Sequence, residues 1–479
     1  MKIKLRLQLK LKIKGTNFLP KLIAIALIFS SAFSQDLYAE TGQPVREPLT
    51  FKNFYRKVLA YYPKLKQQNA NVNLAIANKL TAVSGYLPRL QGVTSLTNGN
   101  DPVYVFGSLL RENRFTADNF ALSSLNTPDP HTTYNASILG QFPIFDAFQT
   151  INRVRSAKLK VDSARDEESF TKMEALLVSV EAYLRAIAID KLLANVEEVS
   201  QASEGDIKQA QDLKTKGLIL GADFYAAKVM YGNINQLKNQ LIQEKQAAHI
   251  LLNILMGEEP LNPITIQGSL AEDVKDTQEL KNWLEAAYKS RPDFAALGKT
   301  IKAQEFEVSR EKATILPRVD SFGEARQDAN SFRFDGGESY IVGLKAQMDL
   351  FDPAYSSRVK ASKETLKKLQ YDNVILKDRI TKDLTDEYAH YEASWDNFPV
   401  ISAMLDDAKQ AMELTLPLYH EGRKSIADLL QIRDSYLNVV RQYYTLTIDT
   451  RTSWTRLLYL SGQLDETKLA EIEKRLTNE

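Results

Sequence analysis

Residues 145–158 read FDAFQTINRVRSAK, and residues 351–363 read FDPAYSSRVKASK. Both stretches open with Phe-Asp, pass through a short spacer to Arg-Val, and reach a Lys soon afterwards. Because an unusual pattern is written twice in one chain, we predict that the chain contains two copies of one structural unit.

Other landmarks recur in the same order. They are Tyr62-Pro63 with Arg291-Pro292 and Leu87-Pro88-Arg89 with Leu316-Pro317-Arg318, both 229 residues apart; Phe145-Asp146 with Phe351-Asp352, 206 apart; and Gly217, Asp223 and Gly257 with Gly422, Asp428 and Gly462, 205 apart. The fall in spacing from 229 to 206 places about 23 additional residues (229 minus 206) in the first copy, between Pro88 and Phe145.

Composition excludes several classes of protein. The chain has 479 residues, of which 44% are apolar, and its 61 basic and 60 acidic residues nearly cancel, so nucleic acid is not expected as a partner. The absence of cysteine excludes disulfides, thiolate catalysis, cysteine-bound metals and a lipoprotein anchor. With 16 prolines and 20 glycines, the composition favours long, uninterrupted helices.

The N-terminal residues 1–39 read as a secretory signal peptide. Seven basic residues precede residues 22–33, LIAIALIFSSAF, an apolar run too short to cross a bilayer comfortably. Small residues suit cleavage before Gln35 or before Glu40. A retained membrane anchor is the alternative.

Each copy is predicted to hold a first helix, two strands and a long helical hairpin. The predicted strands cover residues 90–96, 134–142, 319–326 and 340–348. In the last of these, YIVGLKAQM, Tyr340, Val342 and Leu344 share one face with Ala346 and Met348. Nine alternating residues with one apolar face suit a transmembrane β-strand, and a soluble hairpin is the alternative.

Very long helices follow the second strand of each copy. Asp146 is expected to cap a helix reaching about residue 216, and Asp352 a helix with Pro353 at its first position. Seventy residues at about 1.5 Å each give a helix about 105 Å long, which needs packing partners. Return helices at residues 224–256 and 426–460 predict antiparallel, coiled-coil-like hairpins.

These elements divide the chain into successive parts. We predict a first repeat over residues 40–257, an inter-repeat segment over 258–280, a second repeat over 281–462 and a C-terminal tail over 463–479. Four strands cannot close a barrel, and exposed strand edges cannot remain in lipid, so several copies of the chain must pool their strands. Three copies would give twelve strands, an even number within the range of outer-membrane barrels.

From about residue 49 to residue 462, the chain resembles the TolC-like outer-membrane efflux proteins, also called outer membrane factors. The resemblance rests on the Leu-Pro-Arg helix ends, the two Phe-Asp junctions and the Gly-to-Asp turns at 217–223 and 422–428. It implies a mainly α chain with a transmembrane β part. Three subunits would form one twelve-stranded barrel in the outer membrane, continued by a tunnel of coiled coils across the periplasm. Residues 260–280 and the terminal segments would form a belt around the tunnel.

The resemblance also implies a function. The protein would be the passive exit duct of a tripartite efflux or type I secretion system, driven by an inner-membrane pump through a periplasmic adaptor. The alternative from another class is a periplasmic structural coiled-coil protein without a pore.

The two Gly-to-Asp turns would form the periplasmic tip. Residue by residue, the resemblance assigns the gate to Asp428, Asp223 and Tyr419, with Lys424 in the place of an arginine. Gln431 stands where a second aspartate is expected, so one acidic ring is missing. For Asp428, a plain helix N-terminal charge is the alternative. The adaptor would contact Gly217, Leu218, Gly422, Arg423 and Ser425.

Catalysis finds no support in the sequence. The four histidines, His131, His249, His390 and His420, have no partner at metal-ligand spacing, and no glycine-rich phosphate loop occurs. We therefore expect no catalytic residues, no metal site and no cofactor.

The additional residues of the first copy lie in 97–133, the predicted outward-facing loop between the first two strands. Its apolar run at residues 103–110 either packs on the same loop of a neighbouring subunit or covers part of the pore mouth. A variable surface loop is the alternative.

Overall fold

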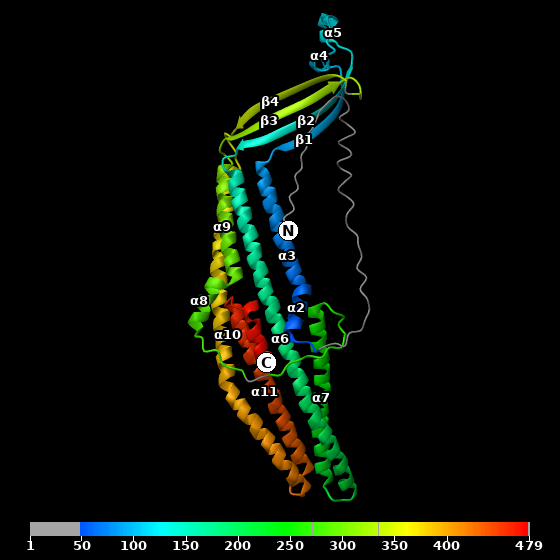
Figure 1. Ribbon diagram of the computed structural model, residues 1–479, viewed down its shortest axis with the longest axis vertical. Helices are drawn as coiled ribbons and strands as arrows, with labels where there is room; N and C mark the ends of the chain where they lie inside the picture. Colours follow the sequence, from blue (N-terminus) through cyan, green and yellow to red (C-terminus); the bar gives the residue numbers. More distant parts are fainter. Residues whose placement is uncertain (1–47, 271–272, 334, 478–479) are drawn as a thin grey trace, which may run out of the picture. The chain divides into compact units, whose positions relative to one another are not determined.

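The computed structural model describes residues 48–270, 273–333 and 335–477, and the predicted signal peptide lies outside them. The described chain is mainly helical, with four strands in one antiparallel sheet (Figure 1), as the sequence predicts. None of its helices combines the length and the apolar character that a membrane crossing demands.

The elements, in chain order, are α2 (Phe51–Tyr61), α3 (Pro63–Val83), β1 (Arg89–Gly99), α4 (Pro102–Arg111), α5 (Leu122–Asn126), β2 (His131–Phe145), α6 (Gln149–Thr215), α7 (Gly221–Met256), α8 (Leu280–Ser290), α9 (Pro292–Ala313), β3 (Arg318–Ala329), β4 (Gly337–Gln347), α10 (Tyr355–His420), α11 (Ile426–Leu460) and α12 (Leu469–Thr477). Short 3₁₀ turns lie at Ser84–Tyr86, Ala117–Phe120 and Glu466–Lys468.

The strands follow one another in the sheet in the order β1-β2-β3-β4, each antiparallel to its neighbour. Three of them contain the predicted ranges, and β4 ends at Gln347, one residue before the predicted end. All four strands extend beyond the predicted ranges at the edge of the sheet that contains Asn98 and Asp328, where polar residues continue the ladders.

The registers place apolar side chains on one face of the whole sheet. Leu90 lies opposite Gly140 in β2, Ile138 opposite Ala325 in β3, and Ala325 opposite Tyr340 in β4. Because side chains alternate along each strand, these residues share one face. Most of the large apolar members of this face are exposed: Leu90, Leu96, Ile138, Phe142, Tyr340, Val342 and Leu344.

The opposite face of the sheet carries charged and amide side chains. The amide Nδ2 of Asn135 donates to Asp328 Oδ1 at 2.9 Å, and Arg326 Nε donates to Asp328 Oδ2 at 2.9 Å. Asp328 is buried beneath these contacts. The sheet is therefore two-sided: one face is mainly apolar, and the other carries the charged and hydrogen-bonded groups together with exposed Leu139, Phe322 and Ile341.

The two long helices begin later than predicted. The Asp146 carboxylate accepts from the Thr150 N–H at 2.7 Å, but Ala147 and Phe148 have positive φ angles of 53° and 65°, so α6 begins at Gln149. Asp352 accepts from the Ala354 N–H at 2.8 Å, and α10 begins at Tyr355. Both aspartates therefore accept backbone hydrogen bonds at the start of a helix while lying outside it. The expectation that each directly precedes its helix, with Pro353 inside the second, is wrong by two residues.

At this junction the first copy is one residue longer than the second. The Phe-Asp pairs are 206 residues apart, whereas Arg153-Val154 and Arg358-Val359 are 205 apart. The additional residue of the first copy lies in the stretch where Ala147 and Phe148 adopt left-handed backbone. The first copy thus accommodates its extra residue in the turn, and its helix is not interrupted.

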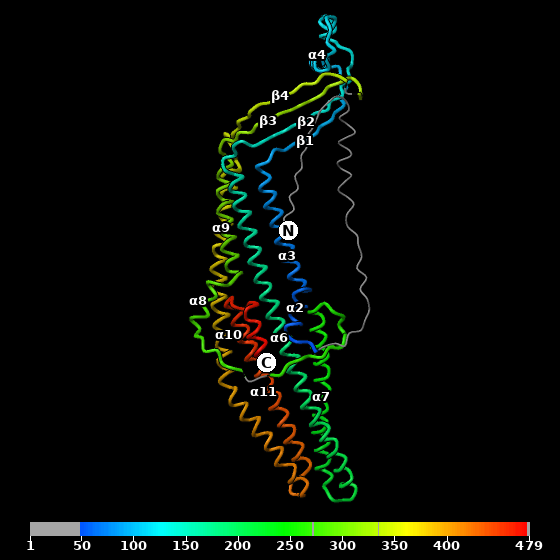
Figure 2. The backbone as a smooth tube through the Cα atoms, in the orientation of Figure 1, coloured from blue at the N-terminus to red at the C-terminus, as the bar shows by residue number. Residues whose placement is uncertain are grey.

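The helices pack into a layer in which α6 contacts α3, α7, α9 and α11, and α10 contacts α9 and α11 (Figure 2). The main core lies where α2, α8 and α12 cover this layer. Its largest buried side chains are Phe51, Phe54, Tyr183, Trp283, Tyr391 and Trp454.

The inter-repeat segment and the C-terminal segment are both attached to this core. The Tyr183 hydroxyl, with a single proton to donate, lies within hydrogen-bond distance of the carbonyls of Leu49 (2.6 Å) and Gln267 (2.5 Å). Arg475 of α12 pairs with Asp273 at 2.7 Å and lies over the Trp454 ring, 3.8 Å from its centroid. Segments from three distant parts of the sequence therefore hold one another against the long helices.

The loop between β1 and β2 is folded. Its apolar run forms α4, which leaves Val103 and Leu110 exposed. After α4, the buried Glu112 carboxylate accepts from the Thr133 hydroxyl at 3.0 Å and lies 3.0 Å from His131 Nε2. This contact ties the loop to the start of β2.

Candidate functional site

Two helix-to-helix turns lie at the end of the helical layer remote from the sheet (Figure 1). Gly217 and Gly422 follow α6 and α10 with φ angles of 72° and 73°, the left-handed region that glycine adopts without a Cβ penalty. The backbone N–H groups of the next residues, Leu218 and Arg423, donate hydrogen bonds to carbonyls of the preceding helices at 2.9 and 2.8 Å. Each turn is therefore a glycine-terminated helix end.

The second turn is closed by a reciprocal capping box. The Ser425 hydroxyl accepts from the Asp428 N–H at 3.1 Å, while Asp428 Oδ2 accepts from the Ser425 N–H at 3.0 Å. Both contacts satisfy donors that the start of α11 would otherwise leave unpaired. The Asp428 carboxylate therefore has a structural task, whatever else it does.

This geometry keeps Asp428 ionised. Hydrogen bonds from the Ser425 backbone and hydroxyl lower the pKa of the Asp428 carboxyl, and the positive charge of Lys424 lowers it further. Lys424 thus acts on Asp428 through space.

The first turn has no capping box and is stabilised by contacts of Lys214. Lys214 Nζ donates to the Tyr225 hydroxyl at 3.1 Å and lies 4.7 Å from the centroid of the Phe224 ring. Asp223 is in the first turn of α7 and makes no hydrogen bond or ion pair within the described residues. The structure of one chain does not bring Asp223 to Asp428.

An apolar cluster, which we call the tip cluster, joins the two turns. It consists of Ala210, Phe224, Ala227, Ile426, Leu429 and Leu430. Tyr419 packs against it, and its buried hydroxyl has no hydrogen-bond partner in the described chain. Burial raises the pKa of Tyr419, and the nearby Asp206 carboxylate raises it further.

An ion pair beside the tip cluster connects the two hairpins. Arg433 of α11 is 5% exposed, and its guanidinium donates to Asp206 Oδ2 at 2.5 Å and to the Ser203 hydroxyl at 3.1 Å, both on α6. Sequence reasoning missed this pair. Its signal was an arginine on the same helix stripe as the buried Ile426, Leu430 and Leu437.

The residues expected to meet an adaptor differ in availability. Leu218, Gly217, Gly422 and Arg423 are exposed at the two turns. Ser425 is partly buried, and its hydroxyl is engaged in the capping box.

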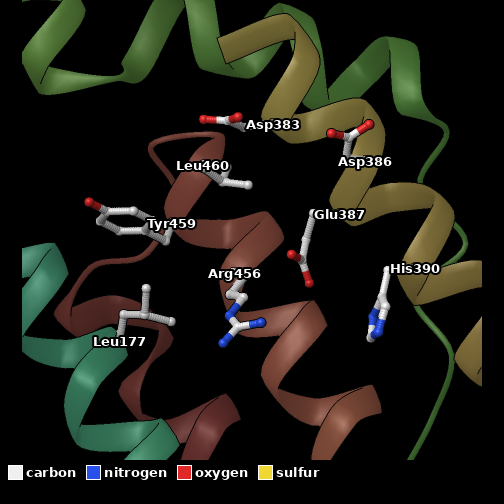
Figure 3. A pocket seen from close by; sticks show the side chains of 8 residues that line it. All are labelled: Leu177, Asp383, Asp386, Glu387, His390, Arg456, Tyr459 and Leu460. Carbon is white, nitrogen blue, oxygen red and sulfur yellow. The ribbon is translucent and has the colours of Figure 1, made fainter. Parts of the chain in front are cut away.

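A cleft between α10 and α11 presents further charged groups (Figure 3). Its lining residues are Leu177, Asp383, Asp386, Glu387, His390, Arg456, Tyr459 and Leu460. Arg456 donates a hydrogen bond to Glu181 Oε1 at 2.8 Å, so the charge of its guanidinium is paired with a carboxylate. The described residues contain no cluster of three or more His, Asp or Glu side chains arranged to hold a metal ion. The cleft presents charged side chains from α10 and α11.

Comparison with known proteins agrees with this architecture. The family model for "Outer membrane efflux protein" matches residues 283–463. The alkaline protease secretion protein AprF of Pseudomonas aeruginosa is 22% identical over 352 residues, covering 71% of this chain and 72% of that protein. The outer membrane efflux protein BepC of Brucella suis biovar 1 is 20% identical, covering 85% of this chain and 83% of that protein.

A solved structure shares the fold over most of the chain. The Campylobacter jejuni CmeC outer membrane channel superposes with a TM-score of 0.71 at 14% identity, covering 94% of this chain and 98% of that one. These comparisons confirm the resemblance to the TolC-like outer membrane efflux proteins that the sequence indicates.

The names of these relatives bear on the broad function. The protein is an outer-membrane transport protein of the efflux and secretion class, as the sequence predicts. The similarity to outer-membrane efflux and secretion proteins favours transport over a structural coiled coil without a pore.

Proposed function

We propose that three copies of this chain form one passive exit duct through the outer membrane and the periplasm. An inner-membrane pump supplies the energy, and a periplasmic adaptor connects that pump to the tip. The chain itself supplies the wall of the duct, the gate at its periplasmic tip and the surface on which the adaptor docks.

The sheet is the observation that carries this proposal. Its apolar face suits lipid and its charged face suits a water-filled lumen, while β1 and β4 each have a free edge in the described chain. Unpaired backbone groups cannot remain in lipid, so other copies must complete the ladder. Three copies supply twelve strands, an even number that a bacterial barrel accepts.

The helical layer has matching free flanks. On one side of α6 lie α3 and α7, and α10 lies on the other (Figure 1). The helices of both flanks carry exposed apolar side chains, among them Leu74 and Leu80 of α3, Val229 of α7, and Tyr371 and Val374 of α10. A heterologous contact between the two flanks forms a ring when the rotation from one copy to the next closes.

In this assembly Asp428 is the gate residue, with Asp223, Tyr419 and Lys424 around it. Three Asp428 carboxylates held near one axis create a negative potential that binds cations. Gln431 is neutral, so the constriction has a single acidic ring from α11. A lysine at position 424 also lacks the bidentate fork of arginine, which weakens any lock that it forms.

The adaptor meets the exposed residues of the turns. Gly217, Leu218, Gly422 and Arg423 present backbone, an apolar side chain and a positive charge at the surface. Ser425 contributes by fixing the shape of the second turn, because its hydroxyl is engaged in the capping box.

The test is the conductance of the purified protein in a planar bilayer, with a multivalent cation added from either side. We expect discrete openings that the cation blocks from one side only. Asp428→Asn should abolish the block, since it removes the charge but keeps an oxygen for the capping box. Ser425→Ala breaks the box, keeps the charge, and should retain the block.

Each part of the proposal has a contrary result. A silent bilayer with folded protein, together with absence from the outer-membrane fraction, would return the poreless coiled coil to first place. A block that survives Asp428→Asn while conductance persists would overturn the gate assignment and leave the duct standing.

A further inference from the structure

The sequence repeat is also a repeat of strand register. Leu90 pairs with Gly140, and moving these positions by the landmark offsets of 229 and 206 gives Val319 and Ala346, which are partners in the β3–β4 ladder. In the same way, Leu96 paired with Tyr134 becomes Ala325 paired with Tyr340. The offsets come from the sequence alone, and they carry one hairpin onto the other without slippage.

The ladder between β2 and β3 joins the last strand of the first copy to the first strand of the second. In a ring of repeated units, the same junction recurs wherever one chain ends and the next begins. Applying the offsets to Ile138 and Ala325, which are partners in β2–β3, gives Leu344 in β4 and Leu96 in β1.

We propose that β4 of one subunit pairs with β1 of the next in this register, with Leu344 opposite Leu96. The neighbouring pairs on the same face are then Ala346 with Thr94 and Val342 with Asn98. This inference rests on the proposed duct, because it requires a second copy at the free edge.

Three observations agree with that seam. The four strands alternate in direction, so β4 and β1 of adjacent copies meet antiparallel, as every other pair does. Leu344 and Leu96 lie on the apolar face and are 70% and 63% exposed in the single chain. A slip of one residue would put Leu344 opposite Ser95 or Thr97, whose side chains project from the charged face.

The chain is well suited to a direct test because it contains no cysteine. Directly opposed residues of an antiparallel pair have Cα atoms roughly 4.5–5.5 Å apart, within the range that a disulfide spans. Oxidation of the Leu96→Cys/Leu344→Cys variant in outer membranes should shift the chain from the monomer band to covalent dimer and trimer bands on a non-reducing denaturing gel.

Matched variants determine the register. Leu90→Cys/Leu344→Cys keeps both cysteines on the apolar face but moves one about 20 Å along β1, and should remain monomeric. Thr94→Cys or Asn98→Cys, each combined with Leu344→Cys, samples a slip of two residues and should cross-link less than the Leu96 variant. Ile138→Cys/Ala325→Cys reports folding and oxidation within one chain, because these residues are opposed in the sheet.

The outcomes separate this inference from the proposed duct. If the Thr94 or Asn98 variant cross-links better than the Leu96 variant, the register is wrong although the seam exists. If no pair links subunits while Ile138→Cys/Ala325→Cys closes and the cysteine-free protein conducts, the β4–β1 seam is wrong and the duct stands. Failure of the duct itself would appear as a cysteine-free protein that neither conducts nor reaches the outer membrane.

Discussion

Arg433 and Asp206 are the most consequential pair of residues at the tip. Both side chains are nearly buried, and they connect α11 to α6 at 2.5 Å. Removing one member leaves the other as an uncompensated buried charge, which costs roughly 3–5 kcal/mol. Arg433→Met should therefore accelerate hydrogen exchange in residues 203–210 by about a hundredfold or more.

Two comparisons make this prediction specific. Arg423 pairs with Glu421 at 3.4 Å in solvent, so Arg423→Ala should leave the exchange rate nearly unchanged. The double variant Arg433→Met/Asp206→Leu replaces both charges with apolar groups and should recover most of the protection. Unaltered exchange in Arg433→Met would show that the pair does not hold the hairpins together.

Asp428 should give the start of α11 a characteristic dependence on pH. Its folded pKa is lowered by hydrogen bonds from Ser425, so its stabilising effect is fully present above the unfolded value of about 3.9 and is lost as pH falls through the folded pKa. The excess protection of the first turn of α11 over Asp428→Asn should persist at pH 5 and vanish only below about 3.9. Exchange measured across that range checks this, and a loss near neutral pH would contradict it.

At the scale of the strand, the two faces of β4 should respond oppositely to charge. Val342 lies on the apolar face and Ile341, its neighbour, on the charged face, and both are exposed in the single chain. An arginine on a lipid-facing strand position costs roughly 2–4 kcal/mol at mid-membrane. Val342→Arg should therefore reduce the amount of folded protein in the outer membrane, whereas Ile341→Arg should be tolerated.

Heat-modifiable gel mobility of outer-membrane fractions would measure this difference. Equal losses from the two substitutions would indicate that neither face of β4 meets lipid.

The strands and long helices were largely readable from the sequence because each has a local signal. Alternation indicated the four strands, and the scarcity of proline and glycine indicated α6 and α10. Helix starts were less accurate: Asp146 accepts from the first turn across two left-handed residues, and no sequence rule announces that Ala147 and Phe148 adopt this backbone.

The candidate site was readable only in part. The glycine-terminated turns and the helix N-terminal position of Asp428 follow from local sequence, and both are present. Arg433 and Asp206 are 227 residues apart in the sequence. A single sequence contains no signal that identifies which residue pairs with which at that separation. The gate role of Asp428 and Asp223 depends on neighbouring subunits and stays a prediction.

At the scale of the whole molecule, assembly should be threefold. The free edges of β1 and β4 and the free flanks of the helical layer belong to opposite sides of one chain, so a closed ring leaves no edge unpaired. Native mass spectrometry of the detergent-extracted protein should give a mass of three chains. A monomer or a dimer that still conducts would contradict the count of twelve strands.

The matching registers of the two halves have a consequence for the history of such a chain. A polypeptide of half this length, with one strand hairpin and one helical hairpin, would already supply the strand register that a six-membered ring needs. All six of its hairpins would be identical. With two units in one chain the hairpins can differ: the first turn reads KGLILG and has no side-chain cap, while the second reads EGRKS and is closed by Ser425 and Asp428. Duplication followed by fusion thus gives the ring two alternating kinds of hairpin, so that one kind can evolve to move while the other remains a fixed frame.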